Sequence, residues 1–281
     1  MSKLGSAILR QSRAADADRV ALVTGANHGI GAATARALAS QGVDVVLTYL
    51  RLVAAADPGT PDDYRRNRAA GAEAIAEGIR AEGGHAAAVE ADLADPVSVP
   101  LLFEAAEHAF GPVNILINNA SGWLADTFKP TAIDRLGRRL QSVSAATIDS
   151  QFAVDARAPA LLIAEFGRRH VARGASWGRI VSLTSGGPLG FPEEVSYGAA
   201  KAALENYTMS AAFELADHGI TANVVYPPVT DTGWVTESVR EAVRASTELL
   251  RIARPDDVAE VIAFLATDQA RLITGNVLHL R

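Results

Sequence analysis

Cysteine is absent from all 281 residues of this sequence. Its absence excludes disulfide scaffolds, thiolate zinc sites, iron–sulfur clusters and cysteine nucleophiles, and we expect no metal site. Basic residues are in the minority, because 26 lysines and arginines face 32 acidic residues and leave a formal net charge of −6. Domains that bind nucleic acid normally carry a basic surplus, so that class of function is disfavoured.

Long apolar runs are missing as well. No stretch approaches the ~18 apolar residues that a membrane helix requires, which argues against a membrane partner. Residues 1–18 lack the solid apolar stretch and the cleavage site of a signal peptide, so we expect a loosely ordered tail, with a transit peptide as the alternative. The missing export signal and the missing cysteines together favour a cytoplasmic protein.

Apolar material, in contrast, is plentiful. Hydrophobic residues make up 49% of the sequence and charged residues 21%, which suffices for a large buried core. The length allows one α/β domain or two smaller ones. No linker rich in proline, serine or glycine divides the chain, so we expect residues 19–281 to form one domain.

Apolar strands alternate with helical patterns from residue 19 onward. The expected strands are residues 19–24, 43–49, 85–90, 113–118, 179–184, 220–226 and 275–280. The expected helices are residues 30–41, 69–82, 97–110, 147–173, 196–217 and 256–267. Two stretches between them, residues 50–68 and 120–146, are irregular, and the first is interpreted as a surface insertion. This alternation predicts a doubly wound, seven-stranded parallel sheet of the Rossmann type, covered by helices on both faces.

A glycine-rich turn follows the first expected strand. It reads TGANHGIG from Thr24 to Gly31 and leads directly into a helix. Gly25 permits a sharp turn, Gly29 permits close approach of a pyrophosphate, and Gly31 permits close packing of helix and strand. Exposed amides at the start of the helix would then hold the anion. A plain turn between strand and helix is the alternative, which the position after the first strand disfavours.

The second expected strand bears on the choice of nucleotide. Dinucleotide folds that bind NAD carry an acid about 20 residues after the glycine turn, whereas this chain continues after Val46 as Leu-Thr-Tyr-Leu-Arg. Arg51 would instead face a 2′-phosphate, with His28 contributing, which favours NADP(H) over NAD(H). The alternative for Arg51 is a solvated loop arginine.

Three residues in the second half form a catalytic pattern. Tyr197 and Lys201 are four residues apart near the start of a predicted helix, so both side chains share one helix face. An ammonium beside a phenol lowers the pKa of the phenol, which suits a general acid or base. Ser185 ends the preceding strand, where its hydroxyl can donate to a substrate carbonyl.

In these features the sequence resembles the short-chain dehydrogenase/reductase family, in its compact single-domain form, from about Arg19 to Leu280. Several motifs in the same order carry the resemblance: TGANHGIG, Asp92-Leu93, Asn118–Ser121 (NNAS), Ser185, Tyr197–Lys201 (YGAAK) and Pro227. The resemblance implies a carbonyl reductase, or the reverse alcohol dehydrogenase. In such a reaction Tyr197 would deliver the proton to the substrate oxygen, Lys201 would bind the nicotinamide ribose and Ser185 would polarise the carbonyl. It also implies a homo-oligomer, a dimer or tetramer.

The resemblance further implies which residues contact the cofactor. Those at the phosphates and the adenosine ribose would be Gly25, Asn27, His28 and Ile30. Those at the adenine would be Asp92 and Leu93. Those beneath the cofactor would be Asn119 and Ala120. Those at the nicotinamide and its carboxamide would be Pro227, Val229 and Thr232.

The sequence departs from the family pattern at three points. Asp155 stands where the family carries a catalytic asparagine. The aspartate keeps the backbone carbonyl that serves the proton relay, but it adds an anion near Lys201. Pro228 replaces a glycine, which fixes φ and removes an amide donor beside the nicotinamide. The chain ends at Arg281, directly after the last expected strand, without the family's short tail, which would open the active site or alter an interface.

The substrate is the least specified part. We expect its pocket to form from residues 122–146, 186–195 and 231–250. Their apolar and aromatic side chains suit an apolar or aromatic carbonyl compound: Trp123, Leu124, Phe128, Leu189, Phe191 and Trp234. Two alternatives stay open. One is a dehydratase, isomerase or cyclase that binds the cofactor without net turnover, and the other is a cofactor sensor, which the retained Ser185, Tyr197 and Lys201 disfavour.

Overall fold

The centre of the molecule is a seven-stranded sheet, as predicted. The computed structural model describes residues 19–53, 56–57, 59–186, 190–246 and 250–281, so the tail expected at residues 1–18 lies outside the described part. The strand order is β3-β2-β1-β4-β7-β8-β9, and every neighbouring pair is parallel. The strands are β1 Val20–Thr24, β2 Asp44–Tyr49, β3 Ala86–Glu90, β4 Val113–Asn118, β7 Gly178–Leu183, β8 Ile220–Tyr226 and β9 Val277–His279.

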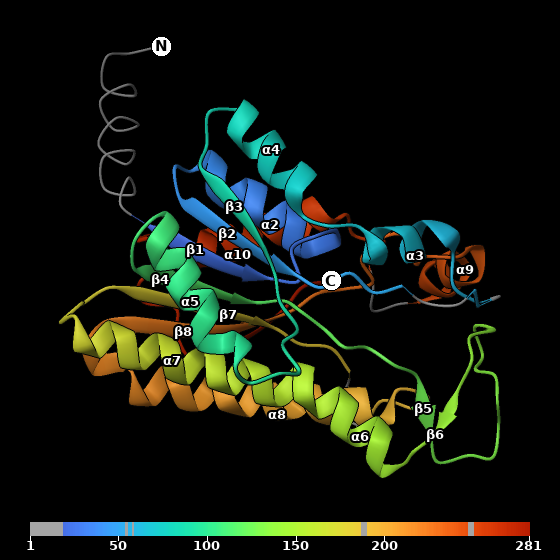
Figure 1. Ribbon diagram of the computed structural model, residues 1–281. Helices are drawn as coiled ribbons and strands as arrows, with labels where there is room; N and C mark the ends of the chain where they lie inside the picture. The colour runs from blue at the N-terminus through green and yellow to red at the C-terminus, as the bar shows by residue number, and fades with distance from the viewer. Residues whose placement is uncertain (1–18, 54–55, 58, 187–189, 247–249) are drawn as a thin grey trace.

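Helices cover both faces of this sheet (Figure 1). Alternate residues of β1 show the division: Ala21 and Val23 lie in one buried cluster, and Val20 and Leu22 in another. The first cluster packs against α2 (Gly29–Ser40), α4 (Glu73–Ala81) and α10 (Pro255–Leu265). The second packs against α5 (Ser98–Ala109), α7 (Ala158–Ala172) and α8 (Val195–Glu214). The order of the strands reverses at β1 and β4, and in such sheets ligands bind beyond the carboxyl ends at this point.

Two helices differ from the sequence prediction. The insertion at residues 50–68 contains α3 (Asp62–Ala69), and the following helix α4 therefore begins at Glu73 rather than at Ala69. Part of the stretch expected as a pocket loop forms α9 (Glu237–Ala245). No apolar periodicity marks α3, because none of its residues is buried, and only Val239 and Val243 are buried in α9. Figure 1 shows both helices beyond the same end of the sheet.

The long helix expected at residues 147–173 is three segments. It begins as α6 (Ala145–Phe152), passes through a π-helical turn (Ala153–Arg157) and continues as α7. Single π-helical turns inside α-helices often occur at functional sites, and this one contains Asp155.

The irregular stretch before this helix, residues 120–146, contains two short paired strands, β5 (Asp126–Thr127) and β6 (Gln141–Ser142). Within the ranges that the structure describes, no helix is long and apolar enough to cross a bilayer.

Candidate active site

A cavity of about 930 Å³ opens beyond the carboxyl ends of the strands. The segments that follow β1, β2, β3, β4, β7 and β8 all contribute to its wall. It is lined by every residue predicted to bind the cofactor or to act in catalysis except Gly31, Arg51 and Asp155. Most of the predicted cofactor-binding and catalytic residues, which are spread over more than 200 positions of the sequence, therefore face one cavity.

The glycine turn needs its glycines for different reasons. Gly25 and Gly29 have φ angles of +63° and +56°, which residues with a side chain rarely adopt. A Cβ on Gly31 would collide with the Gly25 carbonyl oxygen and the Asn119 side-chain amide. That amide donates to the carbonyl oxygens of Thr24 at 2.8 Å and Gly25 at 2.9 Å. The end of β4 thus fixes the shape of the turn.

We expect Gly31→Ala to lower the free energy of unfolding by about 1–3 kcal/mol, as other insertions into packed sites do, and to weaken nucleotide binding. Urea denaturation and cofactor titration measure the two effects. Gly78→Ala is the matched control: Gly78 lies inside α4 with nothing within 4 Å of its would-be Cβ, so that change should be neutral or stabilising. Equal losses in both variants would contradict the role given to Gly31.

Arg51, which was expected to face a 2′-phosphate, lies outside the cavity lining. Its guanidinium pairs with Glu90 at 2.9 Å and Glu73 at 3.1 Å, and its side chain does not line the cavity. Glu73 belongs to α4, and the side chain of Tyr49 also hydrogen-bonds to it. Two acids from neighbouring elements thus satisfy Arg51, which leaves the expected phosphate contact without support.

The catalytic pattern gathers at the start of α8. Lys201 is buried, donates to the Leu183 carbonyl oxygen at 3.0 Å, and places its ammonium 5.7 Å from the centre of the Tyr197 ring. Ser185, two residues after the end of β7, lies close enough to Tyr197 to lower the pKa of its phenol and lines the same cavity. Ser185, Tyr197 and Lys201 therefore present a hydroxyl, a phenol and an ammonium to one cavity.

Asp155 forms a buried ion pair with Lys201. Its carboxylate is fully buried, and one of its oxygens lies 3.1 Å from the Lys201 ammonium. The other oxygen accepts from the backbone amide of Gly122 at 2.9 Å and from the side-chain amide of Gln151. The anion that replaces the family's asparagine therefore neutralises the lysine and ties it to the loop after β4.

The pKa of Tyr197 moves opposite to our expectation. Burial raises it above its ordinary value, and the negative charge of Asp155 raises it further, while the hydrogen bond with Ser185 lowers it. With its charge compensated by Asp155, Lys201 does not offset the burial. The raised pKa favours the protonated phenol, which is the form that donates a proton.

The segment after β8 closes over the glycine turn. Pro227, Pro228, Val229 and Thr232 all line the cavity. A Cβ on Gly29 would lie 2.8 Å from the Thr232 methyl group, so the turn and this segment approach closely. Trp234 donates its ring N–H to the Thr230 carbonyl oxygen at 2.9 Å. This hydrogen bond helps to order the segment that contains Pro228.

Some of the residues expected at the substrate pocket line the cavity. Trp123, Phe191 and Trp234 line the cavity, whereas Leu124 does not and Phe128 is 80% exposed. Leu189 lies outside the described residues. The cavity is also lined by three residues outside the expected pocket ranges, Leu52, Tyr64 and Arg68. Arg135, Arg138 and Glu194, which lie inside those ranges but were not singled out, line it as well. A helix signal, Pro61 followed by two aspartates, marks α3, which carries Tyr64 and Arg68.

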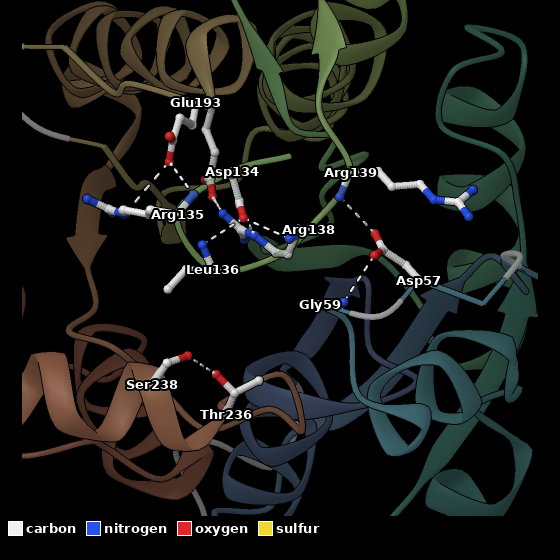
Figure 2. A network of polar contacts seen from close by, with 11 residues as sticks. Asp57, Gly59, Asp134, Arg135, Leu136, Arg138, Arg139, Glu193, Thr236 and Ser238 are labelled. Carbon is white, nitrogen blue, oxygen red and sulfur yellow. Dashed lines mark hydrogen bonds and ion pairs between the residues drawn. The ribbon is translucent and has the colours of Figure 1, made fainter. Parts of the chain in front are cut away.

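The two irregular stretches meet over this side of the cavity (Figure 2). Arg138 pairs with Asp134 at 2.5 Å and with Glu194 at 2.7 Å, and lies over the ring of Trp123. Asp57 of the first stretch accepts from the backbone amide of Arg139 at 3.2 Å. The insertion therefore belongs to the wall of the site and is not a free surface loop.

Comparison with protein families agrees with this geometry. The model described as short chain dehydrogenase matches residues 19–58. The model described as enoyl-(acyl carrier protein) reductase matches residues 64–280, which is most of the chain. An uncharacterized oxidoreductase of Bacillus subtilis is 35% identical over 265 residues, covering 93% of this chain and 95% of the relative.

Solved structures of similar proteins cover the same range. A blue fluorescent protein from a metagenomic library, in complex with NADPH, matches with a TM-score of 0.75 and 32% identity over 93% of this chain and 96% of that chain. An angucycline C-6 ketoreductase with bound NADP matches with a TM-score of 0.74 and 30% identity over 93% of each chain. The fold is thus shared with proteins of known structure.

Proposed function

This chain belongs to the short-chain dehydrogenase/reductase family, and we propose that it is a ketoreductase that transfers hydride between NADP(H) and a carbonyl or alcohol substrate. The observation that carries the proposal is the convergence of Ser185, Tyr197 and Lys201 on the cavity that the glycine turn opens into. Similar proteins with bound NADP or NADPH support the nucleotide, and the similar ketoreductase supports the reaction.

The residues present fit a dinucleotide. Gly25 and Gly29 adopt left-handed backbone conformations, Gly31 has no room for a Cβ, and the His28 side chain does not cap the start of α2. The first amides of this helix would then bind the phosphates. When bound, the reduced nicotinamide supplies a hydride to the carbonyl carbon. Asn119 and Ala120, which lie against the turn, would pass beneath the dinucleotide, and Pro227, Val229 and Thr232 would form the wall beside the nicotinamide.

The protein's own residues then handle the carbonyl oxygen. Ser185 donates a hydrogen bond to it, and Tyr197 donates the proton that completes the alcohol. Burial raises the pKa of Tyr197, which favours the protonated phenol over the phenolate. Lys201, fixed by Asp155 and the Leu183 carbonyl, holds a cation beside the ring and would bind the nicotinamide ribose. Trp123, Phe191 and Trp234 favour an apolar or aromatic substrate.

A direct test mixes the protein with NADPH and a panel of cyclic, aromatic and open-chain ketones and follows nicotinamide absorbance. We expect oxidation of NADPH with at least one ketone, matched by the formation of its alcohol. Binding of NADPH without oxidation across a broad panel would refute the proposed reaction.

A second candidate is a non-redox reaction, such as a dehydration or isomerisation, on the same residues. The observation that favours it is the buried Asp155–Lys201 pair, which places a charged pair behind Tyr197, so that Tyr197 and Lys201 would do the acid–base work. A product that forms without net consumption of NADPH in the same assay would select this candidate. The cytoplasmic location and the homo-oligomeric state stay predictions.

A further inference from the structure

Arg68, near the end of α3, is a half-buried cation in the wall of the cavity. Its guanidinium carbon lies 5.7 Å from the centre of the Tyr64 ring. In the described ranges of the chain its side chain forms no ion pair and donates no hydrogen bond. A half-buried guanidinium without an acid is costly unless an anion meets it, so Arg68 points to a negatively charged ligand.

The other permanent cations of the cavity already have acidic partners. The pairs are Arg138–Glu194, Arg135–Glu193 and Lys201–Asp155. Arg51 outside the cavity is paired as well, with Glu73 and Glu90. The charge left for a ligand therefore sits at Arg68.

The position of Arg68 is fixed at the end of the second strand. Leu52, three residues after β2, donates its backbone amide to the Arg68 carbonyl oxygen at 2.9 Å. The side-chain amide of Asn27 in the glycine turn donates to the Ala70 carbonyl oxygen at 2.9 Å and to that of Asn67 at 3.3 Å. Arg68 is thus held between the end of β2 and the glycine turn.

His28 does not supply a competing charge. Its ring lies 5.9 Å from that of Tyr64, at the same corner of the cavity. Burial, followed by the positive charge of Arg68, lowers the pKa of His28 to about 4. His28 is therefore neutral at pH 7 and leaves Arg68 as the cation beside the turn.

We propose that Arg68 binds the 2′-phosphate of the adenosine ribose and so selects NADP(H) over NAD(H). In doubly wound folds the chain after the second strand meets the ribose, and an arginine there accommodates the 2′-phosphate. In this chain the arginine comes from the helix of an insertion, 17 positions after Arg51. A guanidinium binds a phosphate with two parallel hydrogen bonds. The inference rests on the proposed function, because it concerns the same nucleotide.

Calorimetric titration of the whole protein with NADP⁺ and with NAD⁺ tests the inference, since these ligands differ only in the 2′-phosphate. We expect the wild type to bind NADP⁺ more tightly. Arg68→Gln should weaken NADP⁺ binding by about tenfold to a hundredfold, as expected for the loss of hydrogen bonds to a charged group, and leave NAD⁺ binding unchanged. Arg66→Gln is the control, because Arg66 lies on the same helix, 71% exposed and outside the cavity.

Three results would overturn the inference: equal affinity of the wild type for both ligands, unchanged NADP⁺ binding in Arg68→Gln, or equal losses for both ligands in that variant. If Arg68→Gln does not fold, Arg68→Met, which keeps the stem against Tyr64, replaces it, and the wild-type comparison stands in any case. Failure of the wild type to bind either ligand would refute the proposed function itself. Unchanged NADP⁺ binding together with intact ketone reduction would refute only the role of Arg68.

Discussion

Tyr197→Phe is expected to lower kcat for ketone reduction by about 10²–10⁴-fold, the usual contribution of a positioned general acid. The change removes one oxygen atom and keeps the ring that packs beside Phe191. Because its raised pKa favours the protonated phenol and it lines the cavity together with Ser185, Tyr197 is the donor that we propose for the carbonyl oxygen. Steady-state kinetics with NADPH and a ketone from the panel measures the loss.

The control for this change is Tyr207→Phe on the same helix. Tyr207 is 46% exposed and lies ten positions further along α8, outside the cavity. It should leave kcat unchanged. NADPH binding should be preserved in both variants, which separates a lost proton donor from a damaged cavity. A Tyr197→Phe enzyme that keeps its kcat would remove Tyr197 from the proposed mechanism.

The sheet could be predicted because each of its strands is a buried apolar run between helical patterns. β1, for example, is buried at all five positions, and its neighbours in the sheet are nearly as apolar. The glycine turn could also be predicted, because its spacing follows from backbone geometry. In both cases the structural cause lies within a few consecutive residues, so the sequence pattern is sufficient evidence.

The wall of the cavity was harder to predict because its causes are not local. The helix α3 has no buried residue, and it is held by Asn27, which lies 35 positions before its first residue. The sequence alone favours Arg51 as a phosphate ligand, because its ion pairs with Glu73 and Glu90 form only in the folded chain. Asp155 was identified as a departure from the family pattern, but its effect on Tyr197 depends on burial, which the sequence does not show.

Lys201→Met is expected to lower the free energy of unfolding by about 3–5 kcal/mol, because it leaves a buried carboxylate without its partner. Asp155 has no exposed surface, and Lys201 is 2% exposed. Urea denaturation at a fixed protein concentration measures the change. Lys129→Met, at an exposed lysine, is the control and should stay within about 0.5 kcal/mol of the wild type.

The double variant Asp155→Asn/Lys201→Met separates stability from catalysis. Removing both charges removes the unpaired anion, so at least half of the lost stability should return, while an asparagine oxygen can still accept from the Gly122 amide. Ketone reduction should stay impaired, because no cation remains beside Tyr197. A double variant as unstable as Lys201→Met would mean that the lysine stabilises the fold by packing alone. Recovery of stability without activity would assign the pair two separate tasks: the aspartate makes it possible to bury the lysine, and the lysine serves the reaction.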